Sequence, residues 1–356
     1  MSTPGTRIEF VDRLRGLAVV CMFFVHSAVA WLRPEIKGTT YWVWSMRVSG
    51  MVAPVFMFLA GVAIAMIAEQ GRAAGRDELS LKRRVSLRGL QILALGYGLH
   101  VAFFVFSGFA GSWLRIFKVD VLHCIGLTLA VIPWLMWPRR RLEWRAFAAS
   151  IVILFAGQVT LLVPFGRWLP FGLAAWFSPD RAVSIFPPLP YAAWITMGVF
   201  VGAAWVPVAH DIAAERVFFK RLALAAIVLT LASYGLKALY YGLSLNRFEY
   251  TDNPTRTTIH FFVFKAALVL LIFAVARFAA AAPSRFRFRP FSVFGRRSLF
   301  AYCAHLLLIY HGAGPVFDLH KALTPGQQAL GAAALTAIMT VLVLAVDRWR
   351  RAENRA

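Results

Sequence analysis

The sequence predicts an all-α integral membrane protein that crosses the bilayer about ten times. Of its 356 residues, 60% are hydrophobic and only 15% are charged, and the mean hydropathy is +0.67. Soluble domains are close to half apolar and about a quarter charged, so this composition excludes an ordinary cytosolic globule. It also excludes a disordered chain, because so many apolar residues would collapse or enter lipid.

Ten apolar stretches are long enough to be membrane-spanning helices, each of which needs about 20 residues. The runs are continuous, which excludes the alternating pattern of a transmembrane β-barrel. The ninth is the weakest of the ten because it is short and ends near Gly312, Gly314 and Pro315. The predicted spans are residues 14–33, 44–68, 88–106, 119–137, 146–164, 186–207, 217–241, 257–281, 298–313 and 328–346.

The basic residues give the orientation of these spans. Of the 38 Lys and Arg residues, 26 lie in one set of alternate loops, the adjoining span ends and the two terminal segments, ten lie in the opposite loops and their adjoining span ends, and two lie deeper inside spans. Loops rich in Lys and Arg stay in the cytoplasm, so both termini are predicted to be cytoplasmic. The positive charge therefore indicates membrane topology, and we expect no nucleic-acid partner. We expect one transmembrane domain over residues 1–356, with no separate soluble domain.

The cysteines predict neither disulfides nor a metal centre. Cys21, Cys124 and Cys303 all lie within apolar runs, and their odd number and spacing fit no disulfide framework or metal-binding pattern. We therefore expect no metal ion. The segment from Arg7 through the first apolar run also imitates a cleavable signal peptide, and its cleavage would leave nine spans.

The first span carries a polar stripe. At 100° per residue, Asp12, Arg15 and His26 fall on one face of the helix. Arg15 and His26 are three turns apart, which is about 16 Å along the axis. Arg15 is then expected at the cytoplasmic mouth and His26 at or beyond the bilayer midplane. Ionisable groups at such depths are functional candidates by default. The alternatives are an arginine that snorkels to the interface and a histidine bonded within the helix bundle.

Two more polar groups stand out. Ser298, Tyr302 and His305 share one face of the ninth span, where ordinary hydrogen bonding between helices is the alternative explanation. Asp120 and His123 are three residues apart at the outer start of the fourth span. A carboxylate beside a histidine holds its tautomer and raises its basicity, as a general base requires.

Other ionisable residues are harder to interpret. Lys237 and Lys265 lie inside predicted spans and need partners, for which Glu249 and Asp252 of the connecting loop are candidates. Three further histidines lie toward the outer ends of spans and are interpreted as interfacial residues: His100, His260 and His311.

The outer segment from residue 165 to residue 190 is rich in aromatic residues. Such residues most often anchor a protein at the lipid interface, and an aromatic shelf for a sugar is the more specific interpretation. The residues are Trp168, Phe171, Trp176 and Phe177.

Several motifs together resemble a known group of membrane enzymes. The segment from Asp12 to Ala18, followed by His26, resembles the opening motif of membrane-bound acyltransferases, and the spacing of Arg15 and His26 is the hallmark of the acyltransferase-3 family. The rest of the chain is more similar to the related heparan-α-glucosaminide N-acetyltransferase catalytic domain family. The segments that carry this similarity are residues 53–61, 120–126, 187–191 and 295–302, followed by His305.

The resemblance covers most of the chain and implies a transmembrane acyltransferase of ten or eleven spans. An acyl donor, typically acetyl-CoA, enters from the cytoplasm, and its acyl group reaches a sugar or glycan hydroxyl or amine on the outer face. The residues expected to bind the coenzyme are Arg15, Asp12, Ser298, Tyr302 and His305, and those expected to act in catalysis are His26, His123 and Asp120.

His26 suits either of two roles, as a general base or as a transient acyl carrier. We favour the base, because it requires only one proton transfer. Lumenal members of the family have Asn at the position of His26 and a working histidine in the following loop, whereas this chain has no histidine between His26 and His100. This departure shifts the role to His26 and favours a hydroxyl acceptor over an amine.

Two other classes of function compete with this one. A transporter without acyl chemistry is suggested by Lys265 and by the Gly- and Pro-interrupted segment 51–61, but the sequence has no repeated half of the kind that transporters show. A membrane scaffold is suggested only by small-residue helix faces, which ordinary packing also explains. The basic loops and the ten-span plan suggest a bacterial inner membrane as the location.

Overall fold

The computed structural model describes residues 9–136, 141–163, 165–178, 183–243, 258–280 and 289–353. The described part divides into two compact units. The α1 unit comprises residues 9–56 and 276–353, and the α3 unit comprises residues 57–275. The helices α2 (Thr40–Ala73) and α10 (Ile259–Ala280) pass from one unit to the other. The expectation of one transmembrane domain remains a prediction.

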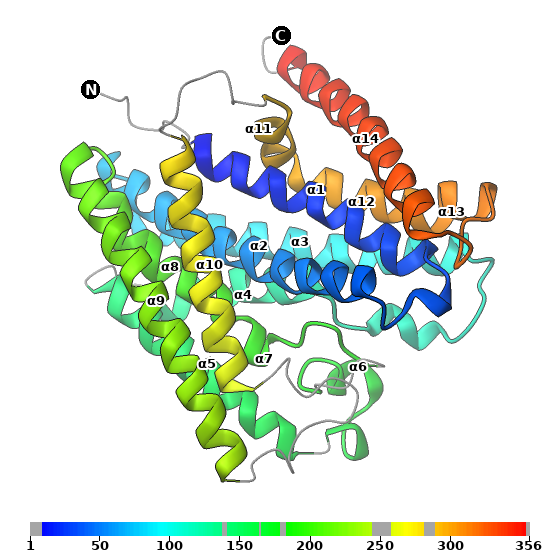
Figure 1. Cartoon of the computed structure of the whole chain (residues 1–356). Coiled ribbons are helices and arrows are strands. Elements are labelled where there is room, and N and C mark those ends of the chain that lie inside the picture. Colours follow the sequence, from blue (N-terminus) through cyan, green and yellow to red (C-terminus); the bar gives the residue numbers. More distant parts are fainter. Residues whose placement is uncertain are drawn as a thin grey trace. The chain divides into compact units, whose positions relative to one another are not determined.

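Helices account for nearly all of the described secondary structure (Figure 1). Within the described residues, extended pairing is limited to two isolated bridges, Leu32 with Leu323 and Val119 with Ser184. The remaining helices of at least ten residues are α1 (Glu9–Trp31), α3 (Glu78–Phe106), α4 (Val121–Met136), α5 (Leu142–Leu162), α8 (Ala193–Trp205), α9 (Ile212–Gly242), α12 (Ser298–Leu307) and α14 (Pro325–Glu353). The shorter ones are α6 (Phe171–Ala174), α7 (Pro188–Tyr191), α11 (Arg289–Arg296) and α13 (Ala313–Val316).

The helices confirm an all-α protein with several membrane spans. Nine helical segments of the described chain are long and apolar enough to cross a membrane, and each corresponds to a predicted span. The ninth predicted span is among them, as the segment Ser298–Val316. The predicted fourth span corresponds to α4, which is apolar but shorter than the others. Its 16 residues extend about 24 Å, somewhat less than the hydrocarbon core.

The α1 unit is built around α1, which packs against α11, α12 and α14. Its core joins α1 to the later helices through Phe23, Phe294 and Met339, all of which are fully or almost fully buried. Glycines let α1 and α11 approach at backbone distance. A Cβ atom on Gly16 would lie 1.9 Å from the carbonyl oxygen of Phe291, and one on Gly295 would lie 1.9 Å from that of Asp12.

The α3 unit contains two close helix pairs, α3 with α4 and α5 with α8. The first pair depends on Gly126, where an added Cβ would lie 2.7 Å from the backbone nitrogen of Leu93. The second pair shares a buried hydrogen bond of 2.7 Å between the hydroxyls of Ser150 and Thr196. Asp120 begins α4 because its carboxylate accepts hydrogen bonds from the first backbone N–H groups of that helix.

Candidate functional site

Two clusters of histidines lie in the described chain, one in each unit. The first, here called the histidine pair, joins α1 to α12. His26 Nδ1 lies 2.8 Å from His305 Nε2, and the two rings are parallel within 3°. His305 is completely buried, and the rings of Phe23 and Tyr302 pack against it. His26 is partly buried.

The hydrogen bonds of the histidine pair determine the tautomer of each ring. His305 Nδ1 lies 2.8 Å from the backbone carbonyl oxygen of Ala301. A carbonyl only accepts, so this Nδ1 carries the proton. In a neutral ring the Nε2 of His305 then carries the lone pair, and it accepts from the Nδ1–H of His26. The Nε2 of His26 is consequently the basic nitrogen of its ring.

The structure brings together only some of the residues predicted to bind a coenzyme. Tyr302 contacts His305, and His305 contacts His26. Asp12 and Arg15 lie about three turns away on α1 and form an ion pair with 3.8 Å between their nearest charged atoms. Asp12 is buried, and its backbone lies at the crossing of α1 and α11. Ser298 is partly buried at the first turn of α12.

Basic side chains of the α1 unit gather around one buried carboxylate. The carboxylate of Asp347 on α14 is buried and forms ion pairs with three arginines of the α1 unit. This region has the excess of guanidinium groups that suits a phosphorylated ligand, because arginine binds phosphate through two parallel hydrogen bonds. The three arginines are Arg296, Arg297 and Arg351.

The second cluster, here called the Asp120 cluster, lies where α3 meets the start of α4. One carboxylate oxygen of Asp120 is 2.7 Å from His123 Nδ1, and the other is 3.2 Å from His100 Nε2. The second ring nitrogen of His100 lies 3.1 Å from the carbonyl oxygen of Ile116. Asp120 and His123 therefore meet as the sequence predicts, whereas His100, which the sequence suggests is interfacial, belongs to this cluster.

His100 could not be identified from a local motif. It lies 20 residues before Asp120, on a different helix, and only the packing of α3 against α4 joins them. The sequence offers one signal. His100 lies near the end of one apolar run, and the next run begins with an aspartate and a histidine.

The Asp120 cluster also has the residue types of a metal site. In the described chain, His100, Asp120 and His123 form the one such group, with ligand atoms within 4.8 Å of one another. Ligands at about 2.1 Å from a tetrahedral zinc ion would lie roughly 3.4 Å apart. The 2.7 Å between Asp120 and His123 Nδ1 is instead a hydrogen-bond distance. The expected absence of a metal remains a prediction.

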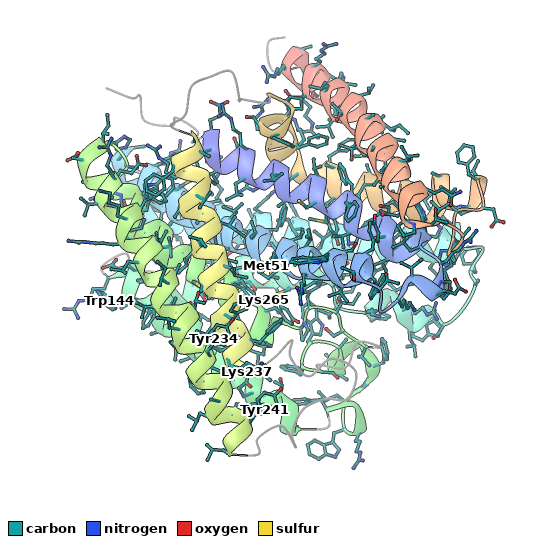
Figure 2. All side chains as sticks on the ribbon, viewed as in Figure 1. Met51, Trp144, Tyr234, Lys237, Tyr241 and Lys265 are labelled. Atoms are coloured by element: carbon teal, nitrogen blue, oxygen red, sulfur yellow. The ribbon has the colours of Figure 1, made fainter. Side chains whose placement is uncertain are left out.

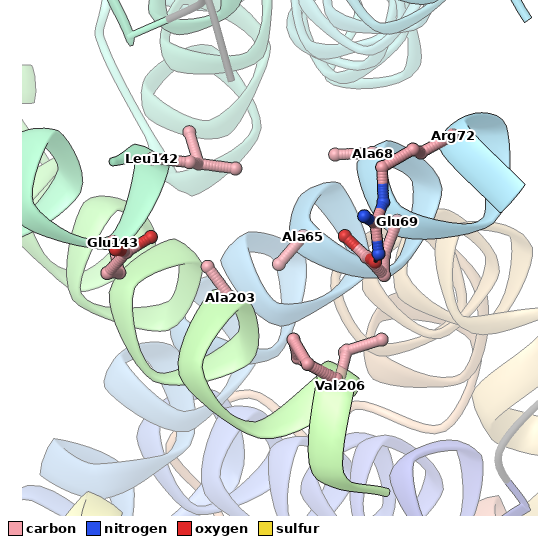
Figure 3. A pocket seen from close by; sticks show the side chains of 9 residues that line it. Ala65, Ala68, Glu69, Arg72, Leu142, Glu143, Ala203 and Val206 are labelled. Atoms are coloured by element: carbon pink, nitrogen blue, oxygen red, sulfur yellow. Dashed lines mark hydrogen bonds and ion pairs between the residues drawn. The ribbon is translucent and has the colours of Figure 1, made fainter. Parts of the chain in front are cut away.

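A hollow of about 560 Å³ lies within the α3 unit. It is bounded by the end of α2, the start of α5 and the end of α8 (Figure 3). Its charged side chains are Glu143 and an ion pair of Glu69 with Arg72. None of the predicted site residues lines it.

Of the two lysines inside spans, Lys237 lies toward the C-terminal end of α9 and Lys265 lies toward the N-terminal end of α10 (Figure 2). Lys237 is exposed on α9, and the Nζ atom of Lys265 on α10 lies 4.5 Å from the centre of the Phe261 ring. The predicted partners Glu249 and Asp252 lie outside the described residues.

The geometry of both clusters suits proton transfer by histidine, and comparison with known proteins gives the family. No curated protein matches the chain. The model of the family described as "Heparan-alpha-glucosaminide N-acetyltransferase, catalytic" matches residues 7–244, about two thirds of the chain. The matched range includes α1 with His26 and the whole Asp120 cluster. The chain therefore belongs to the heparan-α-glucosaminide N-acetyltransferase catalytic domain family.

Proposed function

We propose that this protein transfers an acyl group, acetyl in the family's name, from cytoplasmic acyl-CoA to a hydroxyl of an extracytoplasmic sugar or glycan. Membership of the family supports acetyl transfer in a membrane. The basic side chains around Asp347 and the cation of Arg15 support a phosphorylated donor such as a coenzyme A thioester. A bacterial inner membrane is the proposed location.

The observation that carries this proposal is the hydrogen-bonded chain from Ala301 through His305 to His26. It keeps the lone pair of the His26 ring on Nε2 and fixes the plane of the ring. A general base needs both properties before a substrate arrives, because a misdirected lone pair accepts no proton.

The proposed step is a single acyl transfer. The acceptor O–H bond breaks, its proton passes to His26 Nε2, and the acceptor oxygen attacks the thioester carbon. The carbon–sulfur bond then breaks, and the departing sulfur takes the proton from His26 Nε2 to give the free thiol. While His26 carries both protons, its Nδ1–H continues to donate to His305 Nε2, which stabilises the transient cation. His305 is thus a positioning residue in this proposal rather than a coenzyme ligand.

The test uses the full chain in lipid nanodiscs, with acetyl-CoA and a panel of glycosides. Release of CoA thiol and labelling of the acceptor are both measured. We expect His26→Gln to lower the transfer rate by about 100-fold or more, the usual contribution of a general base. His305→Gln should lower kcat by less and shift its pH dependence, because it changes the environment of the base. His311→Gln, a histidine of the same span as His305, serves as the matched control and should transfer at the wild-type rate.

Full turnover in a correctly folded His26→Gln variant would remove His26 from the mechanism. A wild-type protein that consumes no acyl-CoA of any chain length, with any acceptor in the panel, would overturn acyl transfer itself. The transporter interpretation would then be the leading one.

A further inference from the structure

The Asp120 cluster contains a ring nitrogen without a partner. His123 is completely buried, and its Nε2 atom has no hydrogen-bond partner in the structure. Native proteins pair nearly all of their buried polar atoms, so such an atom indicates either a ligand or an ordered water molecule. A protonated Nε2 would need a hydrogen-bond acceptor as its partner, and an unprotonated Nε2 would need a donor.

The neighbouring hydrogen bonds show which form His123 Nε2 takes. Both ring nitrogens of His100 face oxygen atoms, one of Asp120 and one of Ile116. Oxygens of these kinds only accept, so His100 is satisfied as an imidazolium ion that balances the charge of the Asp120 carboxylate. The carboxylate then needs no second cation, so we take the His123 ring as neutral.

The proton of the neutral His123 ring lies on Nδ1. This atom is 2.7 Å from the Asp120 carboxylate, a distance at which an unprotonated nitrogen would be repelled. The backbone nitrogen of Asp120 is also near Nδ1, but at 3.4 Å it makes the weaker contact. The partnerless Nε2 therefore holds a lone pair, and the group that completes this site must donate a hydrogen bond.

Two aromatic side chains lie against the His123 ring. The Tyr97 ring packs edge-on against His123 at 4.4 Å between centroids, and Trp176 lies at 6.2 Å. Both of these aromatic residues are partly exposed. The buried His123 ring is thus flanked by two aromatic side chains that reach the surface.

Gly96 packs closely against the Nδ1 side of the His123 ring. A Cβ atom there would lie 3.0 Å from His123 Cε1 and 3.2 Å from Nδ1. A side chain at this position would therefore press on the ring and disturb its bond to Asp120. Aromatic walls with one directed polar group are typical of small-molecule sites.

We propose that the Asp120 cluster is a carbohydrate site, in which a sugar packs against Trp176 and donates one hydroxyl hydrogen bond to His123 Nε2. The choice of a sugar rests on the proposed function. It deepens that function by assigning recognition of the carbohydrate to named residues at the predicted outer ends of α3 and α4. Because His123 is completely buried, entry of the sugar requires Trp176 to shift from its place beside the His123 ring.

The test measures binding in the absence of acyl-CoA, with methyl glucopyranoside and N-acetylglucosamine as probes. Each is titrated against the full chain in nanodiscs by saturation-transfer NMR. We expect His123→Leu to weaken binding about tenfold, the effect of one lost hydrogen bond in a buried site. Trp176→Leu should weaken it by a similar factor, which provides a second variant if His123→Leu fails to fold. His260→Leu is the matched control, because His260 is also buried with a partnerless nitrogen but lies outside the cluster.

A second measurement separates a ligand site from a merely structural histidine. In protein labelled with 15N-histidine, the Nε2 signal of His123, identified by its loss in His123→Leu, should show an unprotonated nitrogen that shifts when a probe is added. A protonated Nε2 would overturn the proposal, as would probe affinities that are equal in wild type and His123→Leu. An unprotonated Nε2 that no probe shifts would indicate a buried water molecule and would also overturn it.

The two proposals fail in different ways. Sugar binding without thioester consumption would contradict acyl transfer and leave the carbohydrate site standing. Acyl transfer with equal acceptor KM in wild type, His123→Leu and Trp176→Leu would contradict only the carbohydrate site.

Discussion

The crossing of α1 and α11 makes a sharp prediction about stability. The Cβ atom introduced by Gly16→Ala would lie 1.9 Å from the carbonyl oxygen of Phe291. Carbon and carbonyl oxygen normally approach no closer than about 3.3 Å, so the helices must separate locally by roughly 1.4 Å. The obstacle is a backbone atom, which cannot rotate away as a flexible side chain would.

The expected cost follows from two opposing terms. Overpacking of this kind destabilises by about 1–3 kcal/mol, and a rigid backbone contact favours the upper part of that range. Alanine regains about 1 kcal/mol over glycine in a helix. The net loss is about 2 kcal/mol, which corresponds to roughly a 30-fold smaller ratio of folded to unfolded protein.

The assay compares thermal inactivation of the purified protein in nanodiscs at one fixed temperature. Gly235→Ala is the matched control, because it lies within α9 and an added Cβ there meets no atom within 4 Å. We expect Gly16→Ala to lose its fold markedly faster than wild type, and Gly235→Ala to last as long as wild type or longer. Equal lifetimes for the two variants would show that α1 and α11 do not meet as closely as the structure has them.

Two further predictions concern charge. Asp347→Asn should destabilise the protein by about 1–3 kcal/mol. This is less than the loss of a fully buried ion pair costs, because the arginines are partly exposed. An unchanged midpoint of chemical denaturation would contradict this prediction. For topology, a cysteine placed at Arg83 should react with a membrane-impermeant maleimide only after cells are opened, whereas one placed at Lys37 should react in intact cells with a permeable outer envelope. The reverse pattern would invert the predicted orientation.

The spans were predictable because the bilayer imposes one length and one polarity on every crossing helix. Their ends were less so. The helix α9 begins at Ile212 rather than near residue 217, since Asp211 caps it in the aqueous region before the apolar run starts. The helix α2 likewise extends beyond the predicted 44–68 at both ends. Hydropathy marks where a chain enters lipid, and capping side chains mark where a helix begins.

The site residues show a similar difference between relations within one helix and contacts between helices that are distant in the sequence. Helical periodicity places Asp12, Arg15 and His26 on one stripe, and the spacing of Asp120 and His123 brings them together across one helical turn. Neither rule relates His26 to a residue 279 positions later, on a helix that also packs against α1. Sequence periodicity describes one helix at a time, so the pairing of His26 with His305 emerges only from packing.

The two histidine clusters reach the same tautomer by different means. In each, an acceptor fixes a proton on Nδ1 and leaves the lone pair on Nε2, but the acceptor is His305 Nε2 for His26 and the Asp120 carboxylate for His123. His305→Gln removes the ring that accepts from His26, although the backbone carbonyl of Ala301 behind it remains. Asp120→Asn removes the carboxylate behind His123, and its amide can turn either its oxygen or its nitrogen toward the ring. In both clusters, the nitrogen that carries the proton is therefore set by one neighbouring side chain that a single substitution removes.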